Sequence, residues 1–191
     1  MSDAVVGADG LARCPWAESS DEMRAYHDTE WGRPVRDERG LFERLTLEAF
    51  QSGLSWAIVL RKRPRFREVF ADFDPEVVAA YDGARVAELL SDAGIIRNRT
   101  KVEATIANAG AVRALDGGFA DLVWSFAPPP RPRPTSLAEV PAVTPESKAL
   151  ATALKRHGFV FVGPTTAYAM MQATGMVDDH LAGCHVRSTP D

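Results

Sequence analysis

The sequence has few of the residues that build covalent cross-links, and it has no long apolar run. Only two of its 191 residues are cysteines, and no run of eighteen apolar residues occurs, so a membrane-spanning helix is excluded. The opening MSDAVVGADGLAR lacks the basic start and apolar segment of a signal peptide. Two cysteines in an unsecreted chain indicate reduced thiols, so we expect a cytoplasmic protein without a membrane partner.

A surplus of positive charge is also missing. The formal net charge of −4 argues, at first sight, against a nucleic-acid partner. Basic residues are nevertheless clustered, in RKRPRFR (61–67), in RNRTK (97–101), and at Arg131 and Arg133. Local patches attract a polyanion more directly than net charge does. Ordinary solvated surfaces explain the same clusters, so DNA binding stays open at this point.

Strand signals are few as well, and helix signals cover most of the chain. We expect helices that begin at Ser20, Asp37, Ser55, Pro64 and Asp74, and further helices over residues 84–93, 99–115, 118–126, 144–157 and 164–175. The proline-rich stretch 127–136 predicts an irregular connector. FVFV (159–162) has no strand partner in the sequence and predicts an extended connector. The predicted class is all-α.

Two of these helices, over 84–93 and 99–115, are separated only by GIIRN. This composition is typical of a helix–hairpin–helix, which presents backbone N–H groups and a helix N-terminus to a phosphate. Any pair of antiparallel helices would look similar. The single glycine, Gly94, also departs from the two that such hairpins often carry.

Metal-capable side chains lie at both ends of the chain. Cys14 and His27 come early, and the pair His180 and Cys184 has the spacing of one helical turn. A Cys2His2 set suits tetrahedral Zn2+ and would join the first segment to the last. Two buried thiols and two ordinary histidines are the alternative. His185, beside Cys184, is a conceivable substitute ligand.

Glu48 is a carboxylate placed close to an apolar helix stripe, three residues after Leu45. A buried carboxylate is either paired or functional, because burying it alone is costly. An ion pair with Arg44, four residues earlier, is the simpler interpretation. The aromatic residues near it in the sequence are Trp16, Tyr26, Trp31 and Trp56. Together they favour a pocket for a flat, cationic ring.

The ordered motifs RCPW, AYHDTEWG, LFERLTLEAFQSGLSW, DAGIIRNR, WSF, KRHGFVFVGPTTAY and DDHLAGC resemble those of the 3-methyladenine DNA glycosylase I (Tag) family. The resemblance runs from Arg13 to Cys184. It implies a helix–hairpin–helix glycosylase fold, with two helical lobes in one domain over 13–186 and the hairpin at about 84–110. Residues 1–12 are then expected to form a disordered arm, and 187–191 a tail.

The resemblance also implies specific roles. One structural zinc would be held by Cys14, His27, His180 and Cys184, and Glu48 would be the essential carboxylate. Trp16, Tyr26 and Trp56 would surround the base, while Gln51, Ser52, Gly53 and Leu54 would fill the gap left by the extruded nucleotide, with Leu54 as the plug. Gly94, Arg97, Arg99 and Lys101 would contact DNA. Met23 departs from the family at a position where some members carry a tyrosine.

The expected substrate is double-stranded DNA containing alkylated bases, and the expected protein is a monomer without an obligate protein partner. Two other classes remain open. A non-catalytic, zinc-stabilised DNA-binding module would share the basic stretches but would not need a carboxylate among aromatics. A small-molecule enzyme with a catalytic zinc would need an open coordination position.

Overall fold

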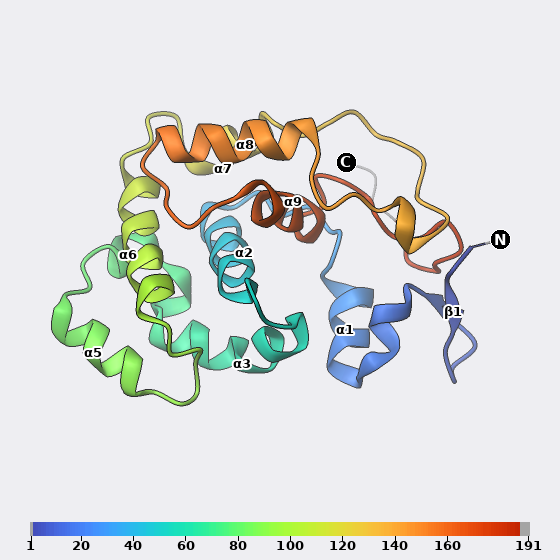
Figure 1. Ribbon diagram of the computed structural model, residues 1–191, viewed down its shortest axis with the longest axis horizontal. Helices are drawn as coiled ribbons and strands as arrows, with labels where there is room; N and C mark the ends of the chain where they lie inside the picture. The colour runs from blue at the N-terminus through green and yellow to red at the C-terminus, as the bar shows by residue number, and fades with distance from the viewer. Residues whose placement is uncertain (1, 188–191) are drawn as a thin grey trace.

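The computed structural model describes residues 2–187 and is mostly helical, as predicted (Figure 1). In this part of the chain the α-helices are α1 (Asp21–Thr29), α2 (Glu38–Gln51), α3 (Trp56–Val69), α4 (Pro75–Val78), α5 (Gly83–Ser91), α6 (Arg99–Arg113), α7 (Phe119–Trp124), α8 (Pro145–Arg156) and α9 (Pro164–Ala173). Short 3-10 segments are η1 (Pro15–Ser19), η2 (Ala71–Phe73) and η3 (Leu137–Glu139), and β1 (Val5–Val6) pairs with β2 (Ala12–Arg13).

The predicted helix starts are confirmed where a side chain caps the first turn. Ser20 accepts a hydrogen bond from the backbone N–H of Met23, and Asp37 accepts one from that of Gly40. At α8, Thr144 and Ser147 form a reciprocal capping box. Such caps satisfy N–H groups that lack a partner within the helix, and they depend only on residues a few positions apart. This is why they can be predicted from sequence.

The prediction that a helix begins at Pro64 is wrong. Pro64 lies inside α3, which continues from Trp56 to Val69. The helix contributes buried side chains on both sides of the proline, among them Val59 and Phe66. Pro64 itself is exposed. Packing of α3 into the core therefore outweighs the loss of one backbone hydrogen bond.

The N-terminal segment, expected to be a disordered arm, is instead an ordered hairpin. Val5 pairs with Arg13 across the β1–β2 ladder, and Gly10 takes a positive φ of 79° in the turn. The backbone N–H of Asp3 also donates to the carbonyl of Thr135 at 2.9 Å. This anchor comes from the proline-rich connector, so nothing local in the sequence reveals it. Of the expected tail, residues 188–191 lie outside the described part.

The core surrounds α2, which is buried over most of its length and packs against α3, α6, α7 and α9 (Figure 1). A second, smaller apolar cluster contains Cys14, Leu181, Cys184 and Val186. It joins the start of the chain to its end beside α1. Within residues 2–187, none of the helices combines the length and apolar character that crossing a membrane requires.

Candidate active site

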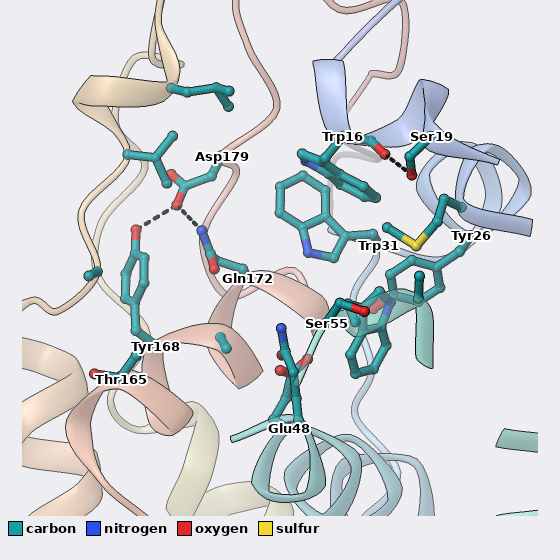
Figure 2. Close-up of a pocket in the computed structure, with 18 of the residues that line it drawn as sticks. Trp16, Ser19, Tyr26, Trp31, Glu48, Ser55, Thr165, Tyr168, Gln172 and Asp179 are labelled. Carbon is teal, nitrogen blue, oxygen red and sulfur yellow. Dashed lines mark hydrogen bonds between the residues drawn. The ribbon is translucent and has the colours of Figure 1, made fainter. Parts of the chain in front are cut away.

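A pocket of about 750 Å³ lies where three parts of the chain meet (Figure 2). Aromatic side chains from η1, α1 and α3 form one wall, and α9 with the segment that follows it forms the opposite wall. Glu48, near the C-terminal end of α2, lies between the two walls. The structure thus brings together the carboxylate and the aromatic residues that the sequence predicts to form a pocket.

The aromatic wall is a connected set of rings. The ring centroid of Tyr26 lies 5.2 Å from that of Trp56, and Trp16 lies 6.4 Å from Tyr26. Within residues 2–187, the Tyr26 hydroxyl and the Trp56 indole N–H are buried without a hydrogen-bond partner. Buried polar groups normally have partners, so these two are suited to a ligand in the pocket. Met23 lines the same wall.

Glu48 is only 7% exposed, and burial raises the pKa of its carboxyl to about 8, although the charge of Arg44 opposes this shift. The ion pair expected between Glu48 and Arg44 is not formed within residues 2–187. Arg44 instead donates to Glu30, with 2.9 Å between Nη2 and Oε2. Glu48 is therefore a buried carboxylate without an ionic partner in the described part of the chain, and a raised pKa in a pocket is typical of a functional group.

The raised pKa predicts how Glu48 affects stability. The usual pKa is 4.5 and the folded value about 8, so between these pH values the folded protein binds the extra proton. The contribution of this group to stability is therefore fully present below about pH 4.5 and is lost as the pH rises to about 8. Glu48→Gln should gain stability relative to wild type by a few kcal/mol, on the order of 2–4, between pH 5 and 8. Urea unfolding across this range tests it, and parallel pH profiles for the two proteins would contradict it.

Asp179 is a second buried carboxylate of the pocket, which the sequence did not predict. It accepts hydrogen bonds from the Tyr168 hydroxyl at 2.6 Å, from Gln172 Nε2 at 2.8 Å and from Arg131 Nη2 at 2.6 Å. Figure 2 shows the first two of these bonds on the wall opposite the tryptophans. Only the position of Asp179 next to His180 could have drawn attention to it, because Tyr168 and Arg131 lie in other segments, 11 and 48 residues away in the sequence.

A cleft of about 350 Å³ adjoins the pocket, and both are lined by Glu48 and Gln51. Its other lining residues are Ser52, Gly53 and Leu54, which follow α2, and Thr165, Thr166 and Ala169 of α9. Gly53 has a φ of +81°, which favours glycine, and Leu54 is 39% exposed. The segment expected to enter the DNA therefore lies directly beside the carboxylate.

The helix pair expected as a DNA-binding hairpin is present as α5 and α6, but the turn between them lines neither the pocket nor the cleft. The backbone N–H of Gly94 is engaged by Asp92 Oδ1 at 2.7 Å. Arg97 is exposed, and Arg99 pairs with Glu103 at 3.2 Å. The helix whose N-terminal end lines the cleft is α9, and its N-cap Gly163 makes no side-chain cap.

The basic stretch 61–67 is largely neutralised within the molecule. Arg63 and Arg67 both pair with Glu43 at 2.7 Å, and Arg65 pairs with Asp92 at 2.7 Å. Most of these basic side chains are thus engaged in ion pairs within the protein.

The surroundings of Lys101 do not support its expected contact with a phosphate. Its side chain is buried, and its ammonium donates to the carbonyls of Phe50 at 2.8 Å and Ser52 at 2.7 Å. Burial also lowers the pKa of Lys101. The sequence suggested a free cation because carbonyl partners about fifty positions away cannot be recognised from it.

Lys101→Met should therefore lower the free energy of unfolding by about 1.5–3 kcal/mol, the worth of hydrogen bonds to a charged group. The dependence of DNA affinity on salt should stay unchanged, because no phosphate contact is removed. Urea unfolding and binding titrations at several salt concentrations measure the two effects. If the variant has normal stability and its DNA affinity depends less on salt, Lys101 does contact a phosphate.

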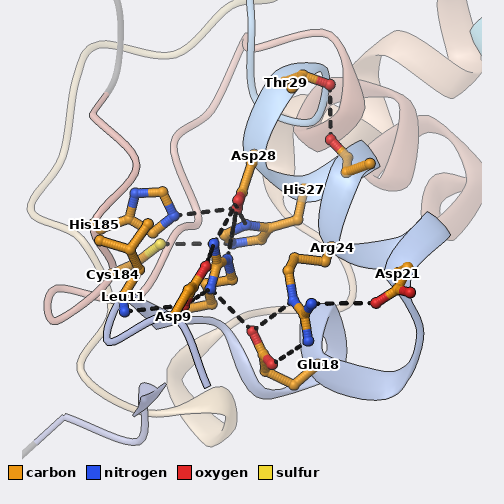
Figure 3. Close-up of polar contacts among 12 residues, drawn as sticks. Asp9, Leu11, Glu18, Asp21, Arg24, His27, Asp28, Thr29, Cys184 and His185 are labelled. Atoms are coloured by element: carbon orange, nitrogen blue, oxygen red, sulfur yellow. Dashed lines mark hydrogen bonds and ion pairs between the residues drawn. The ribbon is translucent and has the colours of Figure 1, made fainter. Parts of the chain in front are cut away.

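Cys14, His27 and Cys184 bring their ligand atoms within 4.8 Å of one another, all buried. The Nε2 atom of His27 faces Cys184 Sγ at 3.6 Å, and its Nδ1 lies 2.8 Å from Asp28 (Figure 3). The hydrogen bond between the two thiols lowers the pKa of Cys184 and raises that of Cys14. The sequence prediction that the two ends of the chain meet here is confirmed.

His180 adjoins this cluster, with its ring centroid 4.9 Å from that of His27. Its Nδ1 lies 3.1 Å from Asp178, and within residues 2–187 its buried Nε2 has no partner. His185 is different, because its Nε2 lies 3.2 Å from Asp28 (Figure 3). The residues whose ligand atoms converge are thus Cys14, His27 and Cys184, and His180 lies beside them with its Nδ1 held by Asp178.

Known proteins resemble this chain over nearly its whole length. Residues 16–188 match the family described as methyladenine glycosylase. The chain is 46% identical over 179 residues to DNA-3-methyladenine glycosylase 1 of Escherichia coli (strain K12), covering 91% of this chain and 96% of that protein. It is 43% identical to DNA-3-methyladenine glycosylase of Haemophilus influenzae (strain ATCC 51907 / DSM 11121 / KW20 / Rd), covering 93% and 98%.

Solved structures agree with this result. A crystal structure of 3-methyladenine DNA glycosylase I (TAG) has a TM-score of 0.87 and 48% identity, covering 91% of this chain and 98% of that one. TAG from Staphylococcus aureus, solved to show the structural basis of 3-methyladenine recognition, has a TM-score of 0.89 and 30% identity, covering 94% and 98%. The chain belongs to the methyladenine glycosylase family.

Proposed function

We propose that this protein hydrolyses the N-glycosidic bond of 3-methyladenine in alkylated DNA and releases the free base, leaving an abasic site. The observation that carries the proposal is the buried Glu48 in a pocket walled by Trp16, Tyr26 and Trp56. The substrate is inferred from the relatives, which are 3-methyladenine DNA glycosylases. A pocket of about 750 Å³ has room for a single extruded base.

The chemistry needs little acid catalysis, because methylation at N3 makes adenine cationic and weakens its bond to the sugar. The protein has to extrude the nucleotide, recognise the cation and hold it in place. Ionised Glu48 accepts hydrogen bonds from the base edge and offsets its charge. The positive charge of the bound base also favours this ionised form.

The aromatic wall completes the recognition of the base. The faces of Trp16 and Trp56 attract the cationic ring, with about 0.5–2 kcal/mol for each contact. The Tyr26 hydroxyl, which is buried and unpartnered within residues 2–187, hydrogen-bonds the base. A neutral adenine gains less from Glu48 and from the ring faces, so the pocket discriminates against undamaged DNA.

The DNA lies along the cleft next to the pocket. Leu54 fills the gap left by the extruded nucleotide, supported by Gln51, Ser52 and Gly53. The N-terminal end of α9, with Thr165 and Thr166, faces the same cleft and suits a backbone phosphate. Arg97 and Arg99 are exposed on the α5–α6 turn and contact phosphates farther along the duplex.

Water, and no side-chain amine, attacks the sugar. The lysine nearest the cleft segment is Lys101, whose ammonium is bound to two carbonyls. A lyase would need a free amine to form a Schiff base. The protein is therefore a monofunctional glycosylase.

One structural Zn2+ is held by Cys14, His27, His180 and Cys184. The orphaned Nε2 of His180 and the convergence of the other three ligand atoms support this assignment. Asp28 and Asp178 hold the Nδ1 atoms of the two histidines, as carboxylates commonly do around zinc ligands. With four protein ligands the ion has no open position, so it cross-links the chain ends and takes no part in the reaction.

Incubating purified protein with methylated DNA and measuring free 3-methyladenine tests the proposal. A non-catalytic DNA-binding module would bind the DNA and release no base. A small-molecule enzyme with a catalytic zinc would show fewer than four sulfur and nitrogen ligands in an X-ray absorption spectrum of the metal.

A further inference from the structure

The turn between α8 and α9 exposes an aromatic side chain in an unfavourable backbone conformation. Phe161 has a φ of +58° and is 40% exposed. Bulky residues rarely adopt a positive φ, and such strain clusters at functional sites. The ring is not a core residue, so packing does not account for its conformation.

Buried groups of α6 hold this turn in place. Asn108 accepts a hydrogen bond from the Val160 N–H at 2.8 Å and donates one to the Val160 carbonyl at 3.1 Å. The side chain of Asn108 is buried, so these two bonds tie the exposed Val160 to a fixed group of the core. The conformation of residue 161 is thus fixed by the protein around it.

Lys101 connects Phe161 to the segment that enters the DNA. Its ammonium lies 5.8 Å from the centroid of the Phe161 ring. The same ammonium donates to the carbonyls of Phe50 and of Ser52, and Ser52 directly precedes Gly53 and Leu54. One buried cation therefore contacts both the Phe161 ring and the segment that leads to Leu54.

We propose that Phe161 is a further DNA-contacting residue, stacking on a nucleotide that flanks the extruded one while Leu54 occupies the gap. This inference rests on the proposed function. The occupant is DNA because Phe161 is linked through Lys101 to the cleft beside Glu48, and because Thr165, four residues later, lines that cleft. An aromatic face stacks on any base, so the contact supports binding whatever the neighbouring sequence.

Binding of the purified protein to a duplex with an abasic-site analogue tests this role. Phe161→Ala should raise Kd about tenfold, the loss expected for one base–aromatic contact. Phe161→Leu, which keeps apolar packing but lacks an aromatic face, should weaken binding similarly with an unchanged Tm. Phe161→Tyr should bind as wild type does. Val160→Ala is the matched control, because Val160 lies in the same turn and is 45% exposed, and it should leave Kd unchanged.

Binding of free 3-methyladenine should stay the same in all four variants, because Phe161 lies outside the base pocket. Wild-type affinity for DNA in both Phe161→Ala and Phe161→Leu would overturn the inference and leave base release by the wild type intact. A wild type that releases no base would instead refute the proposed function. Altered self-association with unchanged DNA affinity would assign Phe161 to an interface between two copies and overturn the inference.

Discussion

Replacing Glu48 by glutamine should slow 3-methyladenine release by about 100- to 1,000-fold, the usual loss when one preorganised electrostatic group is removed from an active site. The substitution keeps the size of the side chain and removes the negative charge that offsets the cationic base. Glu48 is buried in the pocket, so affinity for undamaged DNA should change little. Single-turnover release from methylated DNA, with DNA binding measured in parallel, gives both numbers.

Glu43→Gln is a matched control, because Glu43 is also a buried carboxylate of α2 but pairs with Arg63 and Arg67. This variant should lose stability through its weakened ion pairs. Its single-turnover release should stay near that of wild type at a temperature where it is folded. Equal losses of activity in both variants would indicate a general effect on α2.

Removing one ligand of the proposed zinc site should have the largest effect on stability. Cys184→Ala should be purified without metal, whereas the wild type should carry about one Zn per chain. Structural zinc binding is worth about 10–16 kcal/mol in small domains, so losing it should cost on the order of 5 kcal/mol or more of folding free energy. Metal analysis together with thermal unfolding measures both.

His185→Ala is the control for this site. His185 lies beside Cys184 in sequence, but its Nε2 contacts Asp28 and does not face the cluster of thiols and imidazoles. The variant should keep its zinc and most of its stability. A metal-free wild type, or a Cys184→Ala protein that melts as the wild type does, would contradict the structural zinc.

The parts of the fold that were predictable from sequence are those decided by nearby residues. Ser20 and Thr144 cap helices through contacts within three residues, and both starts were predicted. Pro64 was misassigned because buried neighbours on both sides keep α3 continuous. The N-terminal hairpin was missed because its anchor, Thr135, lies more than a hundred residues away.

The candidate site also contains residues that were predictable from sequence and residues that were not. Glu48 and its aromatic neighbours were selected because a carboxylate near an apolar stripe requires an explanation, and the structure places them in one pocket. Asp179 was not predicted and Lys101 was assigned to DNA, because the contacts of both side chains come from partners in other elements. Long-range partners decide whether a charged side chain is free to bind a ligand or part of the fold.

The central claim, that Glu48 drives release of a cationic base, is tested most directly by one assay. Wild type and Glu48→Gln are incubated side by side with methylated duplex DNA, and free 3-methyladenine is measured under single-turnover conditions. We expect the wild type to release the base and the variant to release it at least about 100-fold more slowly with DNA binding intact. Undiminished release by Glu48→Gln would contradict the assignment.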